Sequence, residues 1–210
     1  MDEAKHIINN KKKWDRWADS FDGNNPVYKY LRHLQSELVA CLDIRENIHF
    51  LDIGCGTGFA LRQAAGMANN RGRFYGVDLS DKMIQKAKSN FSGKDNFHFL
   101  QADAASIPLD DDFFDIIICT NSFHHYLYPD KALKEMHRLL KKGGKLYILD
   151  ATADYLIIKI VDRIFKFVEH EHVKFYSTKE LDRMFKLAGL KHSAMPLKFK
   201  VVSKVHVGEK

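Results

Sequence analysis

The sequence predicts an α/β protein with a doubly wound, mostly parallel sheet. From residue 47 onward, apolar stretches of strand length alternate with segments of helical spacing, as in a sheet covered on both faces. A glycine-rich turn at residues 54–58 separates the first of these strands from the first of these helices. After Asp150 the alternation ends, and the tail at residues 191–208 suits two short strands. We therefore expect seven strands, with an antiparallel hairpin formed by the tail.

The central segment contains five predicted strands and three predicted helices. Ser80 precedes the second helix and is expected to cap its start. Pro129 opens the third helix, and Gly143 and Gly144 are expected to close it. The predicted strands are 47–53, 73–80, 96–103, 113–121 and 145–150, and the predicted helices are 57–69, 80–90 and 129–144.

Helical segments flank this core on both sides. Residues 14–22 and 27–42 carry apolar side chains at helical spacing. Residues 153–172 form a long apolar segment of the same spacing, and the next helix opens with a capping box of Ser177 and Glu180. We expect one domain made of a helical lid (1–45), a core (46–150) and a cap helix with sheet-completing strands (151–210).

The composition is that of an ordinary globular protein, with 45% hydrophobic and 29% charged residues. No apolar run is long enough to span a bilayer, and the first residues do not read as a secretory signal. The three cysteines are widely spaced, which favours reduced thiols in the cytoplasm over disulfides or a zinc site. The net charge of +6 includes short lysine clusters that fit a solvated surface better than a nucleic-acid site. The clusters lie at 11–13, 141–145 and 198–204.

The glycine turn excludes two common nucleotide motifs. A P-loop needs a lysine after its last glycine, and none follows Gly58. A dinucleotide fingerprint needs a small residue where this chain has Phe59. The motif present is Gly-x-Gly-x-Gly with Asp52 two residues ahead of Gly54. This spacing resembles the first motif of class I S-adenosylmethionine-dependent methyltransferases, in particular the small-molecule group known as methyltransferase type 11.

Four further segments resemble this family in the family's order, so that the resemblance covers residues 47–150. Asp78 ends the second strand, where it can accept both hydroxyls of a ribose. The segment "QADAASIP" resembles the family's adenine-contacting stretch, with Asp103 accepting from the exocyclic amine and Ala104 lining the ring. Residues 114–125 and 132–150 resemble the segments that follow. The resemblance implies S-adenosylmethionine as cofactor, bound by Asp52, Gly54, Gly56, Gly58, Asp78, Leu79, Met83, Asp103, Ala104 and Asn121.

Several of these assignments keep a structural alternative. Asp52 is expected to meet the cofactor's ammonium, although it could simply cap the turn. Met83 fits either the core or a cover on the adenine. Asn121 is expected at the methionine end of the cofactor.

The stretch "NSFHHY" at 121–126 holds the candidate catalytic residues. His124 or His125 can take a proton from an acceptor, because histidine titrates near neutral pH. The alternative is that both histidines only pack or hydrogen-bond at the strand end. No partner that orients either imidazole is evident in the sequence. DNA-methylating enzymes carry Asn or Asp followed by Pro-Pro here, so this chain is not expected to methylate DNA bases.

The acceptor itself has no motif. The resemblance and the aromatic residues outside the core suggest a small-molecule pocket lined by Trp17, Tyr28, His172 and Tyr176, with no metal. The segments 155–168 and 169–177 are a second candidate lid, and the apolar helix could also lie on a membrane or form a dimer face. Two other functions stay open, a non-catalytic S-adenosylmethionine-binding protein and a nicotinamide-dependent oxidoreductase.

Overall fold

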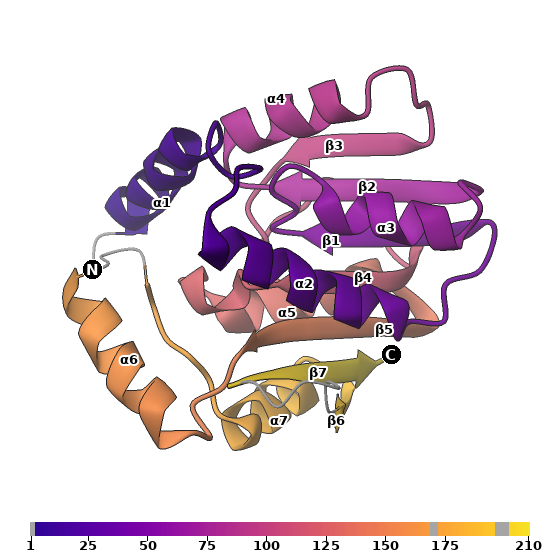
Figure 1. Ribbon diagram of the computed structural model, residues 1–210. Helices are drawn as coiled ribbons and strands as arrows, with labels where there is room; N and C mark the ends of the chain where they lie inside the picture. The colour runs from indigo at the N-terminus through magenta and orange to yellow at the C-terminus, as the bar shows by residue number, and fades with distance from the viewer. Residues whose placement is uncertain (1–2, 169–171, 196–201) are drawn as a thin grey trace.

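The computed structural model describes residues 3–168, 172–195 and 202–210, which form a seven-stranded sheet with helices on both faces (Figure 1). The strand order is β3-β2-β1-β4-β5-β7-β6. The first five strands in this order are parallel, and β7 is antiparallel to both of its neighbours. The predicted doubly wound sheet with a C-terminal hairpin is therefore confirmed. The strands are β1 Ile48–Ile53, β2 Gly72–Asp78, β3 Phe97–Gln101, β4 Phe114–Thr120, β5 Leu140–Ala151, β6 Lys191–Met195 and β7 Ser203–Glu209.

Alternate side chains of the strands feed two separate apolar cores. In β1, Phe50 belongs to the core under α2 (Pro26–Ala40), α3 (Phe59–Met67) and α4 (Asp81–Asn90). Its neighbour Leu51 belongs to the opposite core, under α5 (Pro129–Leu139) and α7 (Thr178–Leu187). Both faces of β1 are thus buried, which is why apolar side chains occupy the adjacent positions Phe50 and Leu51 and do not simply alternate with polar ones. The carboxyl ends of the parallel strands stay between these layers at one edge of the sheet.

Two helices lie along that edge, at the left of Figure 1. They are α1 (Glu3–Trp17) and α6 (Leu156–Val168). The predicted helical segment 14–22 overlaps α1 only at residues 14–17, because α1 ends at Trp17 and the chain then forms a turn. This turn brings Phe21 against Gly56 in the glycine turn. α1 and the turn therefore cover the strand ends.

The predicted end of the third core helix is wrong. α5 ends at Leu139, and Leu140 already pairs with Phe114 at the start of β5. The backbone of Gly143 donates to Lys210 and that of Gly144 accepts from it, so the glycines belong to β5 and not to the end of the helix. The predicted caps at Ser80 and at Ser177/Glu180 are confirmed by their hydrogen bonds. Parts of the predicted hairpin, lid segment and lysine cluster, at 169–171 and 196–201, lie outside the described residues.

Candidate functional site

The glycine turn after β1 is shaped by contacts inside the protein. Gly54 and Gly56 have φ values of 77° and 52°, in the left-handed region that favours glycine. A Cβ on Gly54 would overlap Ser122, and one on Gly56 would lie 3.1 Å from the Phe21 ring. The glycines thus make room for the side chains of Ser122 and Phe21. From the sequence alone, the need for glycine was attributed to a ligand. A cavity lies beside this turn at the carboxyl ends of the parallel strands. Gly54 and Gly56 line it, whereas Gly58 is the N-cap residue of α3.

Asp78 ends β2 beside this turn and lines the same cavity. Its Oδ2 accepts a hydrogen bond from the Gly56 backbone N–H at 2.9 Å, and its Oδ1 accepts one from the Ser80 backbone at 2.9 Å. Burial raises the pKa of this carboxyl, although the two backbone donors oppose the shift. Each carboxylate oxygen keeps a further lone-pair direction for a ligand.

Asp52 lies in β1 behind the turn and outside the residues that line the cavity. It is fully buried, and both of its carboxyl oxygens lack a hydrogen-bond partner among the described residues. Burial and the nearby charge of Asp78 raise its pKa to about 8. At neutral pH this carboxyl is therefore mostly protonated.

The residues expected around an adenine lie together on the cavity wall. Leu79 and Met83 come from the end of β2 and the start of α4, and Asp103 and Ala104 follow β3. Asp103 accepts a hydrogen bond from the Ala105 backbone at 2.8 Å through Oδ1. Its Oδ2 has no partner among the described residues.

Asn121 follows β4 and also lines the cavity. Its φ of 52° lies in the left-handed region, which asparagine adopts more readily than most residues other than glycine. Its backbone N–H donates to Leu149, whereas its side-chain Nδ2 is buried with no partner in the described chain. A buried unsatisfied donor on a cavity wall favours an absent ligand as its partner.

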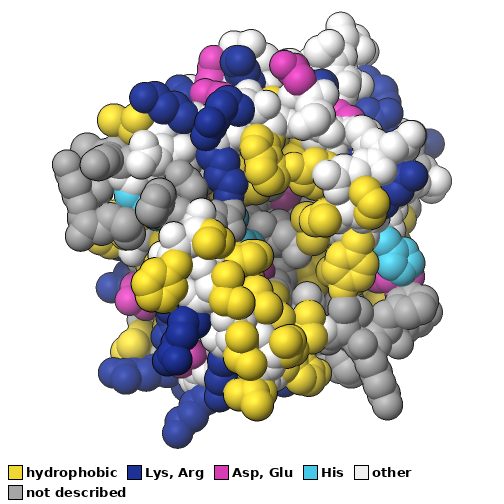
Figure 2. Space-filling model, turned by 60° about the vertical axis from the view of Figure 1, so that its left-hand side comes forward, with side chains coloured by type: hydrophobic (Ala, Val, Ile, Leu, Met, Phe, Trp, Pro, Cys, Tyr) yellow, Lys and Arg dark blue, Asp and Glu magenta, His cyan; other side chains and the backbone are white. Residues whose placement is uncertain are grey.

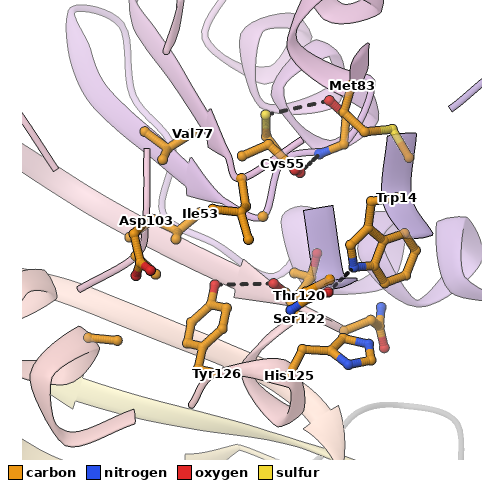
Figure 3. Close-up of a pocket in the computed structure, with 18 of the residues that line it drawn as sticks. Trp14, Ile53, Cys55, Val77, Met83, Asp103, Thr120, Ser122, His125 and Tyr126 are labelled. Carbon is orange, nitrogen blue, oxygen red and sulfur yellow. Dashed lines mark hydrogen bonds between the residues drawn. The ribbon is translucent and has the colours of Figure 1, made fainter. Parts of the chain in front are cut away.

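The two adjacent histidines face different surroundings. The Nδ1 of His124 lies 2.8 Å from Asp150, and this histidine is absent from the cavity wall. His125 lines the cavity, and its ring meets Trp14 edge-on with centroids 5.4 Å apart (Figure 3). The sequence reasoning found no partner for either imidazole, and Asp150 at the end of β5 corrects this for His124.

The N-terminal segment is fastened over the cavity by two aspartates that the sequence reasoning missed. Asp15 accepts a hydrogen bond from the Ser80 hydroxyl at 2.6 Å, next to Asp78. Asp22 accepts one from the Thr57 hydroxyl at 2.6 Å, inside the glycine turn. Both anchors hold the segment on the loops that follow β1 and β2. No sequence signal distinguishes these aspartates from the exposed ones around them.

The predicted acceptor residues are not all brought together. Tyr28 lines the cavity, whereas Trp17 packs outside it, edge-on to Trp14 and Tyr28. His172 lies behind the wall, with Nε2 2.8 Å from the Asp162 carboxylate. Tyr176 packs on Phe123, also outside the lining.

Residues of α1, α2 and the segment after β4 complete the cavity. Figure 3 shows Trp14 and His125 on one side of the space, with Asp103 across from them. A helical stripe in the first residues could have pointed to α1 as part of the wall, but apolar stripes usually mark core contacts. Trp14 and Phe21 belong to the aromatic residues of the expected N-terminal lid, whereas the lining residues that sequence reasoning missed include His6, Asn10, Arg32 and Gln35.

Within the described ranges, no three histidine, cysteine or acidic side chains gather as a metal site. The helices of those same ranges include none that is both long and apolar enough to cross a bilayer.

Comparison with known proteins agrees with this geometry. Residues 51–148 match the model of the methyltransferase domain family. A demethylmenaquinone methyltransferase of Staphylococcus epidermidis is 30% identical over 160 residues, which cover 72% of this chain and 64% of that protein. The match therefore spans less than two thirds of that relative's length. A demethylmenaquinone methyltransferase of Bacillus mycoides is 28% identical, over 94% of this chain and 93% of its own.

The fold has a similar counterpart among solved structures. The crystal structure of the YcgJ protein of Bacillus subtilis superposes with a TM-score of 0.70 and 28% identity, over 78% of this chain and 71% of that one. The family match falls on the glycine turn, Asp78 and the strands that position them. Together, the family match, the named relatives and the fold support a class I S-adenosylmethionine-dependent methyltransferase.

Proposed function

We propose that the protein transfers a methyl group from S-adenosylmethionine to a small or medium-sized acceptor bound in the same cavity. The observation that carries this proposal is one cavity with two chemically different walls. Asp78 and Asp103 line it beside the glycine turn, and Trp14, Tyr28 and His125 line it under the N-terminal cover. Carboxylates suit the hydroxyls and amine of a nucleoside, and aromatic rings suit an apolar acceptor.

The residues present fit this cofactor. Asp78 would accept the ribose hydroxyls through lone pairs that its two backbone donors leave open. Asp103 would accept from the adenine amine through Oδ2, and Asn121 would donate to the methionine carboxylate through its unsatisfied Nδ2. Asp52 lies behind the turn, where a nearby ammonium would favour its charged form.

We infer an acceptor with a planar, apolar part. Three aromatic rings of the cavity wall are in contact: the Phe21 ring centroid lies 6.4 Å from that of Trp14 and 4.9 Å from that of Tyr28. Such rings favour a flat partner through offset or edge-on packing. Relatives in this family carry the name demethylmenaquinone methyltransferase, and a quinol ring has this shape. A quinol is accordingly the first acceptor to test.

When bound, the cofactor supplies a methyl group already activated by its sulfonium. The chain mainly holds the acceptor in line and keeps water out, so that proximity and orientation supply most of the acceleration. The cover fastened by Asp15 and Asp22 closes the cavity on the acceptor side. His125 is the histidine of the segment after β4 that can take a proton from an acceptor there.

Calorimetry and a transfer assay test this function. S-adenosylmethionine should bind and NAD should not; binding of NAD alone would favour an oxidoreductase. The protein should then methylate a soluble demethylated quinol or one of a panel of phenols and amines, detected with labelled methyl groups. Cofactor binding without transfer to this panel or to cell extract would instead support a non-catalytic S-adenosylmethionine-binding protein.

A further inference from the structure

α6 carries an exposed apolar face that the proposed chemistry does not use. Leu156, Phe167 and Val168 are 73%, 78% and 71% exposed, and Ile160 and Ile164 are about half exposed. At 100° per residue, these side chains occupy one continuous arc of about 120° on the helix. Figure 2 shows hydrophobic side chains gathered over α6 in the lower half of this face, with Lys and Arg beside them.

A basic edge follows one side of the apolar arc. Lys159, Arg163 and Lys166 project between the apolar arc and the buried side of the helix. Lys166 pairs with Asp162, whereas Lys159 and Arg163 have no acidic partner among the described residues. Asp162 is the helix's one acidic residue, and it faces inward, where it accepts hydrogen bonds from His172 and the Phe175 backbone. The exposed surface of α6 is therefore apolar and cationic, without an exposed acid.

We propose that α6 docks in the plane of an anionic membrane surface. A helix with an apolar arc and a cationic edge buries the arc at the boundary of headgroups and acyl chains, while its cations meet lipid phosphates. The positive charge of Lys159, Arg163 and Lys166 is complementary to anionic headgroups, and an amphipathic helix of this pattern is typical of those that lie in the plane of a bilayer. Burying the arc removes exposed apolar surface from water, and Lys159 and Arg163 gain the anionic partners that the described chain does not give them.

A second copy of the chain fits the face less well. A helix of 13 residues is about 20 Å long, so its apolar strip covers on the order of 200 Å². A stable dimer buries about 800 Å² per partner, several times this strip. Two copies paired through α6 would also bring no exposed acidic residue of that helix to the cations.

The inner side of α6 connects this surface to the cavity wall. Phe165 packs on His172 with ring centroids 5.6 Å apart, and His172 packs on His124 at the same distance. His124 adjoins His125, which lines the cavity. Docking through α6 would therefore place the membrane close to the cavity, with His172 and His124 between Phe165 of this helix and His125 of the cavity wall.

Vesicle cosedimentation tests the proposal on the whole chain. The protein should bind vesicles of phosphatidylglycerol and phosphatidylcholine, and bind pure phosphatidylcholine far more weakly. The double variant Lys159→Gln/Arg163→Gln should bind the anionic vesicles about 30-fold more weakly, at about fivefold per cation. The double variant Ile160→Ser/Phe167→Ser should lose about tenfold or more, because less apolar area enters the bilayer.

Two control variants remove the same kinds of side chain, two cations or two exposed apolar residues, from helices other than α6. Lys88→Gln/Lys134→Gln lowers the net charge equally from α4 and α5 and should keep wild-type binding. Met67→Ser/Leu187→Ser removes exposed apolar residues of α3 and α7 and should do the same. Circular dichroism melting confirms that all variants fold.

Three outcomes would overturn the proposal. The first is equal binding of the α6 variants and their controls, and the second is no binding of the wild type to anionic vesicles. The third is a dimer in solution that Ile160→Ser/Phe167→Ser dissociates. These measurements use neither cofactor nor acceptor, so calorimetry with S-adenosylmethionine judges the proposed function separately.

Discussion

The carboxylate of Asp150 holds His124 through two hydrogen bonds, at 2.8 Å from its Nδ1 and 3.1 Å from its backbone N–H. This pairing fixes the short helix after β4, Phe123–His125, and keeps the His124 ring off the cavity wall. The next residue in the same turn, His125, then lines the cavity. The two adjacent histidines are therefore separable: His124 holds the loop, and His125 lies on the cavity wall where we propose that the acceptor binds.

The first prediction separates these histidines. If His125 serves as a base, His125→Asn should lower turnover by roughly 10²–10⁴ and remove a histidine-like limb from the pH profile. Cofactor affinity should stay within a few-fold, since the glycine turn and Asp78 carry it. Steady-state kinetics across pH and calorimetry measure the two effects. Wild-type turnover in His125→Asn would mean that catalysis relies on positioning alone.

His124→Asn is the matched comparison. It should destabilise the fold by about 1–3 kcal/mol, because the buried Asp150 loses a hydrogen-bonding partner. Turnover per folded molecule should fall far less than in His125→Asn. Denaturant unfolding and active-site titration distinguish the two variants. A larger loss of turnover in His124→Asn would reverse the assignment.

The second prediction concerns the ribose. Asp78→Ala should weaken S-adenosylmethionine binding by about 2–4 kcal/mol, for two charge-assisted hydrogen bonds that do not add fully. It should also lower the free energy of unfolding by about 1–3 kcal/mol, because the backbone N–H groups of Gly56 and Ser80 lose their acceptor. Calorimetry and denaturant titration measure these changes. An unchanged dissociation constant in a folded variant would place the ribose elsewhere.

The third prediction concerns the N-terminal cover. Asp15→Asn/Asp22→Asn weakens the hydrogen bonds that fasten the cover to Ser80 and Thr57. Amides of α1 should then exchange with solvent faster, by about fivefold to thirtyfold for a loss of roughly 1–2 kcal/mol. Asp19→Asn is the control, since the Asp19 side chain is 90% exposed and its carboxylate comes no closer than 3.8 Å to the Lys86 ammonium, which is a loose ion pair. Equal exchange in both variants would show that other contacts hold the cover.

The fold was predictable because it depends on periodic features of the chain. Apolar runs such as residues 116–119 need no distant partner to indicate a buried strand, and the caps at Ser80 and Ser177 are local. The end of α5 was mispredicted for the opposite reason. Leu140 and Gly143 are drawn into β5 by Phe114 and by Lys210, which are remote in sequence.

The site divides in the same way. Asp78 and Asp103 follow strands directly, so the topology alone brings them to one edge. A helical lid at residues 1–45 was expected from the sequence, but its anchors could not be predicted, since the Asp15–Ser80 and Asp22–Thr57 contacts join residues 65 and 35 positions apart. Asp150 shares the strand-end position of Asp78 and could have been selected by that signal.

The last prediction concerns the buried carboxyl of Asp52, whose pKa is raised from 3.8 to about 8 by burial and by Asp78. Between pH 3.8 and about pH 8, Asp52 keeps its proton in the folded protein but releases it in the unfolded chain. The unfolded chain therefore binds fewer protons, and the free energy of unfolding falls as pH rises. The loss is about 1.4 kcal/mol per pH unit within this window and ends above pH 8.

Asp52→Asn should remove this slope from the cofactor-free protein, because the amide does not ionise. The variant should gain stability relative to wild type from pH 5 to pH 8, with the difference growing steadily, as measured by denaturant unfolding at each pH. Asp154→Asn is the control: burial raises the pKa of Asp154, but bonds from Lys204 and Thr178 lower it to about 2. Its contribution is lost only as pH falls below about 4, so its variant should keep the wild-type slope. Parallel curves for wild type and Asp52→Asn would mean that Asp52 is ionised in the folded protein.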